Sequence, residues 1–281
     1  MKIFHKNKGF FIVILTMVLL MNHNMVYGQL DNTQTMTKSG TTAAQFLKIG
    51  VDARATAMGN AFTAMEGDVS SIFWNAAGLA NVHRLETIFV NNDWLAGVSF
   101  HYLGFALPLR RVGVLGLSVT SLTVPDDKVR TVTKPEGTGE YWGAQDLAVN
   151  LSFARKLTDK FSIGGNIKYI QQTIWHSHAN TFALDLGALF VTPFKDIRLG
   201  ASLANYGGEL HMTGRDQKLS VDPDPINQGN VEFVNALYET DSFPLPLIFR
   251  VGLSGELIKT ESLRLSFGVD ALHPNDNTEA V

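Results

Sequence analysis

Apolar and polar residues alternate along much of the chain, and this alternation defines its predicted elements. In residues 143–155, for example, Val149 and Leu151 alternate with Asn150 and Ser152. Successive side chains of a strand point to opposite faces, so the pattern predicts a strand with one apolar face and one small or polar face. It predicts nine such strands, at residues 86–91, 97–108, 112–124, 143–155, 161–175, 181–191, 197–205, 247–258 and 263–273.

The connections between the predicted strands alternate in length. Those after the second, fourth, sixth and eighth strands are short, whereas those at residues 125–142 and 206–246 are long. Short turns on one side and long loops on the other are typical of outer-membrane barrels. We therefore predict an all-β fold, a transmembrane antiparallel up-and-down β-barrel. A secreted β-sandwich would also alternate, but several predicted strands exceed the ~5–6 residues usual in globular proteins.

The N-terminus has the pattern of a secretory signal peptide, which we assign to residues 1–28. A basic start at Lys2 precedes an apolar run at residues 9–21, and Gly28 ends a small-residue cleavage site. The run is shorter than the ~20 residues that a membrane helix needs. Residues 29–45 are polar and rich in Thr, and we predict a flexible segment there.

Residues 46–79 differ from the rest in their density of Ala and Gly. Small side chains allow the backbone to pack closely against other structure, so this part is predicted to be compact, irregular and partly helical. Asp68 precedes a short apolar run and is the expected N-cap of a helix.

Composition excludes several kinds of chemistry. The chain has no Cys, which excludes disulfides, thiolate metal sites and thiol nucleophiles. Its net charge of −3 gives no basic field for nucleic acid. His176 and His178 lack an evident third metal ligand, and residues 222–225 lack the ligand spacing of a calcium loop. With no catalytic arrangement evident either, we expect no enzyme, no cofactor and no metal site.

Four segments resemble the PorV/PorQ family of Bacteroidota outer-membrane proteins, which are built like the FadL fatty-acid transporters. They are FLKIGVDARATAMGNAFTAMEGDVSSIFWNAAGLANV at 46–82, DWLAGVSFHYLGFALPL at 93–109, LPLIFRVGLSGEL at 245–257 and DALHPNDN at 270–277. The resemblance implies a FadL-like barrel of about fourteen strands in the cell outer membrane, in contact with lipid. It also implies that residues 46–85 form a hatch or plug inside a barrel that occupies residues 86–281.

The chain departs from this family in two places. The hatch motif Asn75, Ala76, Ala77 and Gly78 has Ala76 where the family usually has Pro, which loosens a turn that Pro would hold. Family members also continue for several strands beyond residues 270–277. Because bacterial single-chain barrels have an even number of strands, we expect a C-terminally truncated chain with about nine of the fourteen strands. Strands overlooked within 206–246 are the alternative.

Charged residues at inward positions of the predicted strands, together with one in the hatch, form a candidate charge network in the barrel lumen. Arg54 in the hatch is the expected partner of Asp146 or Asp185. Buried charges need partners, so pairing within the barrel or with the hatch is the plainer interpretation; lining a solute path is the other. The candidates are Arg54, Asp146, Lys168, Asp185, Arg250, Glu256, Arg264 and Asp270.

The resemblance implies a role in type IX protein secretion. PorV-like proteins receive exported cargo, and PorQ-like relatives act in surface attachment; both roles fit the quoted segments. The expected partners are the secretion translocon and cargo C-terminal domains, met by the loops at 125–142 and 206–246. A FadL-like channel for uptake of hydrophobic compounds is the alternative, because fold alone does not determine function. A scaffold without a transported solute is a third possibility.

Overall fold

The computed structural model describes residues 38, 40–194, 196–223, 233–260 and 263–277. These residues all belong to one unit, at 37–281. The signal peptide assigned to residues 1–28 lies outside the described residues. So do residues 29–37 and 39 of the segment predicted to be flexible at 29–45. The structural account therefore concerns the hatch and the strands.

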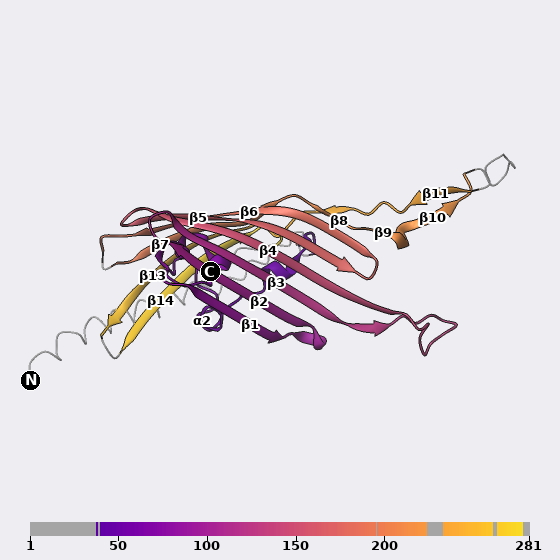
Figure 1. Ribbon diagram of the computed structural model, residues 1–281, viewed down its shortest axis with the longest axis horizontal. Helices are drawn as coiled ribbons and strands as arrows, with labels where there is room; N and C mark the ends of the chain where they lie inside the picture. The colour runs from indigo at the N-terminus through magenta and orange to yellow at the C-terminus, as the bar shows by residue number, and fades with distance from the viewer. Residues whose placement is uncertain (1–37, 39, 195, 224–232, 261–262, 278–281) are drawn as a thin grey trace, which may run out of the picture. The chain divides into compact units, whose positions relative to one another are not determined.

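Nine long strands form one antiparallel sheet in chain order, with each strand beside the next (Figure 1). This confirms the predicted up-and-down arrangement. Within the described residues β1 pairs with β2 and β14 pairs with β13 at the two edges. The strands are β1 Glu86–Asp93, β2 Ser99–Leu109, β3 Gly113–Lys128, β4 Tyr141–Thr158, β5 Phe161–Ile174, β6 Ser177–Val191, β7 Arg198–Gly207, β13 Ile248–Lys259 and β14 Arg264–Pro274.

Both long connections differ from their predicted form. β3 and β4 extend past a bulge near Val124, so the first connection shortens to residues 129–140. The second contains a 3-10 helix and short strands, which the prediction of an unbroken loop missed because two to four residues cannot show a period of two. They are β8 Leu210–His211, β9 Thr213–Gly214, η5 Arg215–Gln217, β10 Lys218–Val221, β11 Val234–Leu237 and β12 Ser242–Phe243.

None of the described short strands lies on the path of the nine long strands. β9 pairs with the start of β6, β10 pairs with β11, and β12 pairs with β8. We call the end of the sheet with these long connections the loop end. The opposite end, with the short connections after β2, β4, β6 and β13, is the turn end.

The two faces of the sheet differ sharply in side-chain size and polarity. On β2, Leu103 and Phe105 are exposed, whereas Phe100, Tyr102 and Ala106 on the other face are buried. The same alternation continues across the sheet. Exposed apolar residues of the outward face include Leu115, Leu117, Leu151, Phe153, Ile163, Ile167, Phe182, Leu184, Phe190, Leu199, Phe249, Val251, Leu253, Leu265 and Val269.

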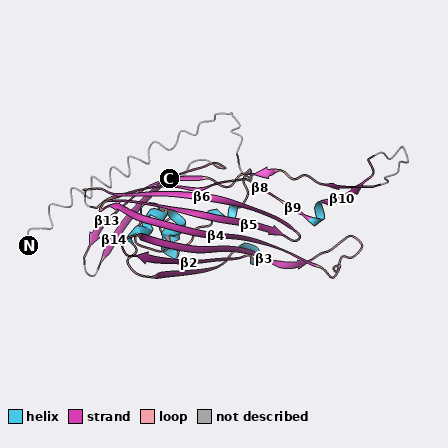
Figure 2. Ribbon diagram, turned by 45° about the horizontal axis from the view of Figure 1, so that its top comes forward, coloured by secondary structure: helices cyan, strands magenta, loops and turns pink. Residues whose placement is uncertain are grey.

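The hatch covers the other face of the sheet with short helical segments, drawn in cyan in Figure 2. They are η2 Gln45–Lys48, α2 Ala53–Ala57, α3 Ser71–Trp74 and η3 Ala76–Asn81; η4 Leu95–Gly97 lies outside the hatch, between β1 and β2. The N-cap of α3 is Ser70, two residues after the expected Asp68. Asp68 instead accepts the backbone N–H of Ser70.

Apolar side chains of the hatch pack into the buried face of the sheet at both ends. Phe46 and Leu47 pack near Ile170 towards the loop end, and Ile72 and Leu79 pack with Val114 towards the turn end. The hatch therefore runs across the sheet from the loop end to the turn end. None of the helices in the described part of the chain has the length and apolar composition that a membrane span requires.

Candidate functional site

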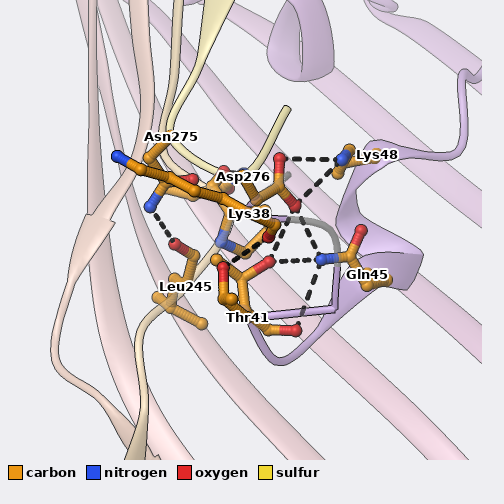
Figure 3. Close-up of polar contacts among 10 residues, drawn as sticks. Lys38, Thr41, Gln45, Lys48, Leu245, Asn275 and Asp276 are labelled. Carbon is orange, nitrogen blue, oxygen red and sulfur yellow. Dashed lines mark hydrogen bonds and ion pairs between the residues drawn. The ribbon is translucent and has the colours of Figure 1, made fainter. Parts of the chain in front are cut away.

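At the loop end, Asp276 joins the residues after β14 to the start of the hatch (Figure 3). The Lys48 ammonium lies 3.0 Å from each carboxylate oxygen. Thr42 Oγ1 and Gln45 Nε2 each donate to Oδ2 at 2.8 Å. Asn275 fixes the position of this carboxylate, because its side chain donates to the backbone oxygen of Leu245 at 3.1 Å.

The Asp276 carboxylate is nearly inaccessible to water, with a side-chain exposure of 3%. Burial alone would raise the pKa of Asp276. The hydrogen bonds from Gln45, Thr42 and Lys48, with the positive charge of Lys48, outweigh that effect and lower its pKa below the ordinary value. The contact is therefore an ion pair at neutral pH.

In the middle of the sheet, the side chain of Asp270 on β14 binds the backbone of the hatch. Its Oδ2 accepts the N–H groups of Phe62 and Thr63, at 3.0 and 2.9 Å. Ser254 of β13 donates to the backbone oxygen of Ala64 at 2.8 Å. Two neighbouring strands thus satisfy consecutive backbone groups of an irregular segment, which would otherwise be buried without partners.

Asp185 of β6 lies at the centre of a second buried network. Lys168 Nζ lies 2.8 Å from its Oδ2 and also donates to Asn205. Asn166 donates to the same carboxylate at 2.6 Å and to the backbone oxygen of Ile72 in the hatch at 2.9 Å. The network therefore neutralises two buried charges and contacts the hatch through Asn166.

Arg250 of β13 lies between these two networks and is 4% exposed. The charges of Asp185 and Asp270 both act on it, and its guanidinium lies 5.8 Å from the centre of the Trp74 ring. Its Nε and Nη1 atoms have no hydrogen-bond partner within the described residues. Arg250 is thus held by the charges of the two carboxylates and by the indole, which belongs to the hatch.

The hatch motif lies very close to the sheet. Asn75 donates to the backbone oxygens of Thr63 and Ala188, and its Oδ1 accepts the N–H of Ala77. The backbone here lies against Gly164 and Gly187, which are opposite each other on β5 and β6.

These two glycines are required for that approach. A Cβ at Gly187 would lie 2.1 Å from Asn75 Oδ1, and one at Gly164 would lie 2.5 Å from the carbonyl carbon of Ala76. Sequence reasoning missed both as site residues. The available signal was glycine at inward positions of otherwise regular strands, which marks a close backbone contact.

At the turn end, Glu66 of the hatch pairs with Arg198 at the start of β7. The Arg198 Nε to Glu66 Oε1 distance is 2.7 Å. Arg198 also lies 3.5 Å from Glu256 of β13, and Asn81 donates to the other oxygen of Glu66. Glu256 is thus joined to the hatch through Arg198, a residue that sequence reasoning did not select.

The remaining candidates lie elsewhere. The sequence predicted that Arg54 pairs with Asp146 or Asp185, and this prediction is wrong. Arg54 pairs with Asp68 within the hatch at 3.2 Å, and Lys168 already neutralises Asp185. Asp146 accepts a hydrogen bond from Nε2 of Gln172. Oε1 of the same Gln172 side chain accepts the backbone N–H of Ala44.

The predicted residue Arg264 begins β14, but its side chain lies outside what the structure describes. No group of three or more metal-binding side chains gathers among the described residues. His176 contacts Asp216 and Arg215 instead. The arrangement as a whole anchors the hatch to the sheet: polar and charged side chains fix it at the loop end, in the middle and at the turn end.

Comparison with known proteins bears on the role of such an arrangement. A family model described as "Type IX secretion system protein PorV" matches residues 31–192, more than half of the 281 residues. The match covers the hatch and the strands β1 to β6. No curated protein matches the chain.

Proposed function

Because the chain belongs to the family of the type IX secretion system protein PorV, we propose that it docks exported cargo at the cell surface as an outer-membrane β-barrel. The family match is the observation that carries this proposal. It supports a role in type IX secretion and association with the outer membrane. Barrel closure, contact with lipid and cargo docking go beyond the family match and are what we propose.

The outward face of the sheet supports insertion in a lipid bilayer. Large apolar side chains stand exposed on all nine long strands, from Phe89 to Val269. Soluble monomers rarely expose apolar patches larger than a few hundred Å². In lipid, unpaired backbone groups cost several kcal/mol each, so we expect the edges at β1 and β14 to be paired in the inserted protein.

Aromatic side chains support the loop end as the cell-surface side. Tyr141 and Trp142 begin β4, and Trp175 lies between β5 and β6; all three are exposed. Such residues form belts at the membrane interface. Longer loops face the outside in outer-membrane barrels, so the loop end is the surface that cargo reaches.

The second long connection offers side chains suited to a protein partner. Phe233, Leu237 and Tyr238 are each about 60% exposed or more. Leu237 ends β11, and Phe233 and Tyr238 flank that strand. The β10–β11 pair has no other partner among the described strands. Exposed aromatic side chains are enriched in protein interfaces, and an unpaired hairpin edge can accept a further strand.

The uptake channel is less well supported. It requires a movable hatch and an apolar pocket under the outer loops. The hatch is fixed at three levels. The cavity at the loop end has a mixed lining, in which Leu237 and Tyr238 lie beside His176, Arg215 and Glu239, so it favours neither function. The fixed hatch favours a plugged docking protein.

A deletion strain tests the proposal. We expect cargo proteins to be lost from the medium and the cell surface, and restored by the unsubstituted gene. A variant with residues 218–237 replaced by a Gly-Ser linker should reach the outer membrane in folded form without restoring secretion. As the control, replacing residues 130–134 in the other loop by a Gly-Ser linker should leave a folded protein that reaches the outer membrane and restores secretion. Normal secretion in the deletion strain would reject the proposal, and slower uptake of a hydrophobic compound would favour the channel.

A further inference from the structure

A second cavity, of about 340 Å³, lies at the turn end of the sheet, away from the loops. Its wall combines the end of the hatch near His83, the turn between β2 and β3, and the last residues of β4. This volume is at the small end of the ~300–1,000 Å³ range of ligand pockets.

The cavity is lined by four cationic side chains, Arg110, Arg111, Arg155 and Lys156. None of the described residues that line the cavity carries a carboxylate. All four cations are exposed, and none forms an ion pair with any residue that the structure describes. In a chain with a net charge of −3, this is a local concentration of unpaired positive charge.

The backbone of Arg110 determines which substitution suits this position. Its φ is +38°, in the left-handed region that favours glycine. It follows Leu109 in a tight turn closed by the Val112 N–H and the Leu109 carbonyl. Glycine would therefore fit the backbone at position 110 at least as well as arginine does.

One of these charges, that of Arg155, relates the cavity to the outward face. Arg155 continues the outward series of Leu151 and Phe153 along β4, and Leu157 follows it; all four are exposed. A ligand bound here would meet cations and apolar surface together. Guanidinium groups recognise phosphate by paired hydrogen bonds, and basic pockets at membrane boundaries bind anionic headgroups.

We propose that this cavity binds the phosphate group of an anionic phospholipid whose acyl chains lie along the outward face. The inference rests on the proposed membrane insertion and goes beyond it, since secretion itself does not require such a site. An acidic peptide would use the charges but not the apolar residues beside them, so the lipid is favoured.

The test uses purified protein in a neutral detergent. Short-chain phosphatidylglycerol is titrated, and its dissociation constant is read from the rise in the thermal unfolding midpoint. Short-chain phosphatidylcholine, inorganic phosphate and an oligoglutamate peptide are titrated in parallel. Phosphatidylglycerol should stabilise the protein at concentrations where the other three do not.

The test variant is Arg110→Gly with Arg155→Gln, because glycine suits the backbone of position 110 and both sites are exposed. Each cation near a lipid surface contributes about fivefold to binding, so phosphatidylglycerol should bind roughly 25-fold more weakly. Arg130→Gln with Lys134→Gln removes the same charge at the loop end and should bind as the unsubstituted protein does.

Equal stabilisation by inorganic phosphate, binding of the peptide alone, or equal binding by both variants would each overturn the proposal. Membrane insertion is measured separately, by the shift in electrophoretic mobility of the folded barrel on heating. A variant that inserts and supports secretion but has lost lipid binding would separate this inference from the proposed function.

Discussion

The hatch is held differently in the middle of the sheet and at the loop end. In the middle, Lys168, Asp185, Arg250 and Asp270 are each 4–6% exposed. At the loop end, the Lys48 side chain that pairs with Asp276 is 31% exposed. Water can replace a lost partner of Lys48 but not of Arg250. Removing a partner should therefore lower the free energy of unfolding more in the middle of the sheet than at the loop end.

The largest effect is expected in the middle. Asp270→Asn keeps the shape of the side chain and removes its charge. Of the two described carboxylates that act on Arg250, Asp185 then remains, and Lys168 already neutralises it. Because an uncompensated buried charge is costly, the free energy of unfolding should fall by about 3 kcal/mol. Urea titration of the protein in lipid vesicles measures this loss.

A double variant provides the control. Arg250→Met combined with Asp270→Asn should cost less than the sum of the two single changes, because it removes both the charge and its partner. Additive losses would contradict the electrostatic link between the two side chains.

A smaller loss is expected where the backbone of the hatch touches the sheet. Gly187→Val suits a strand but places a Cβ 2.1 Å from Asn75 Oδ1, so the hatch motif must move. We expect the free energy of unfolding to fall by about 2 kcal/mol, with faster proteolysis of the hatch. Ala188→Val, the next residue on the outward face, should change neither; equal effects would contradict the close contact.

The loop-end contact should contribute less and depend on pH. Lys48→Met should lower the free energy of unfolding by about 1 kcal/mol at pH 7. Because the pKa of Asp276 is lower in the folded protein than in the unfolded chain, its contribution is complete above the unfolded value of about 3.9 and disappears as pH falls through the folded value. Unfolding titrations from pH 7 to pH 3 measure the difference; a difference that grows in acid would contradict the ion pair.

The smallest effect has the opposite sign. Ala76 is the first residue of η3, and Asn75 before it is already extended, with φ −158° and ψ 104°. Proline fits the first position of a helix after an extended residue. Ala76→Pro should therefore raise the free energy of unfolding by about 0.5 kcal/mol, measured in the same titration with Ala77→Pro as a destabilising control. A lower free energy of unfolding for Ala76→Pro would contradict a helical first position at residue 76.

The strands were predictable because all but the first carry their period of two over nine or more residues. The short strands β8 to β12 were not, since two to four residues show no period. The partners of Asp270 and Asp276 lie more than 200 residues earlier in the chain, and only the fold brings them together. Arg54 was assigned a distant partner because its position in the hatch was unknown, whereas Asp68 nearby in the chain pairs with it.

A single engineered disulfide tests the central claim, that the hatch is fixed and the outer loops act. The chain has no cysteine, and a Cβ at Gly268 would lie 3.6 Å from that of Ala61, within the ~3.5–4.5 Å of a disulfide. It would also lie 2.8 Å from the backbone oxygen of Ala61, so this part of the hatch must shift slightly, and the Gly268→Cys single variant controls for that shift. Ala61→Cys with Gly268→Cys, produced in the deletion strain, therefore joins the hatch to β14. Equal secretion by the oxidised double variant, each single variant and the unsubstituted protein is the predicted result. Secretion that is lost on oxidation and regained with reductant would contradict the account.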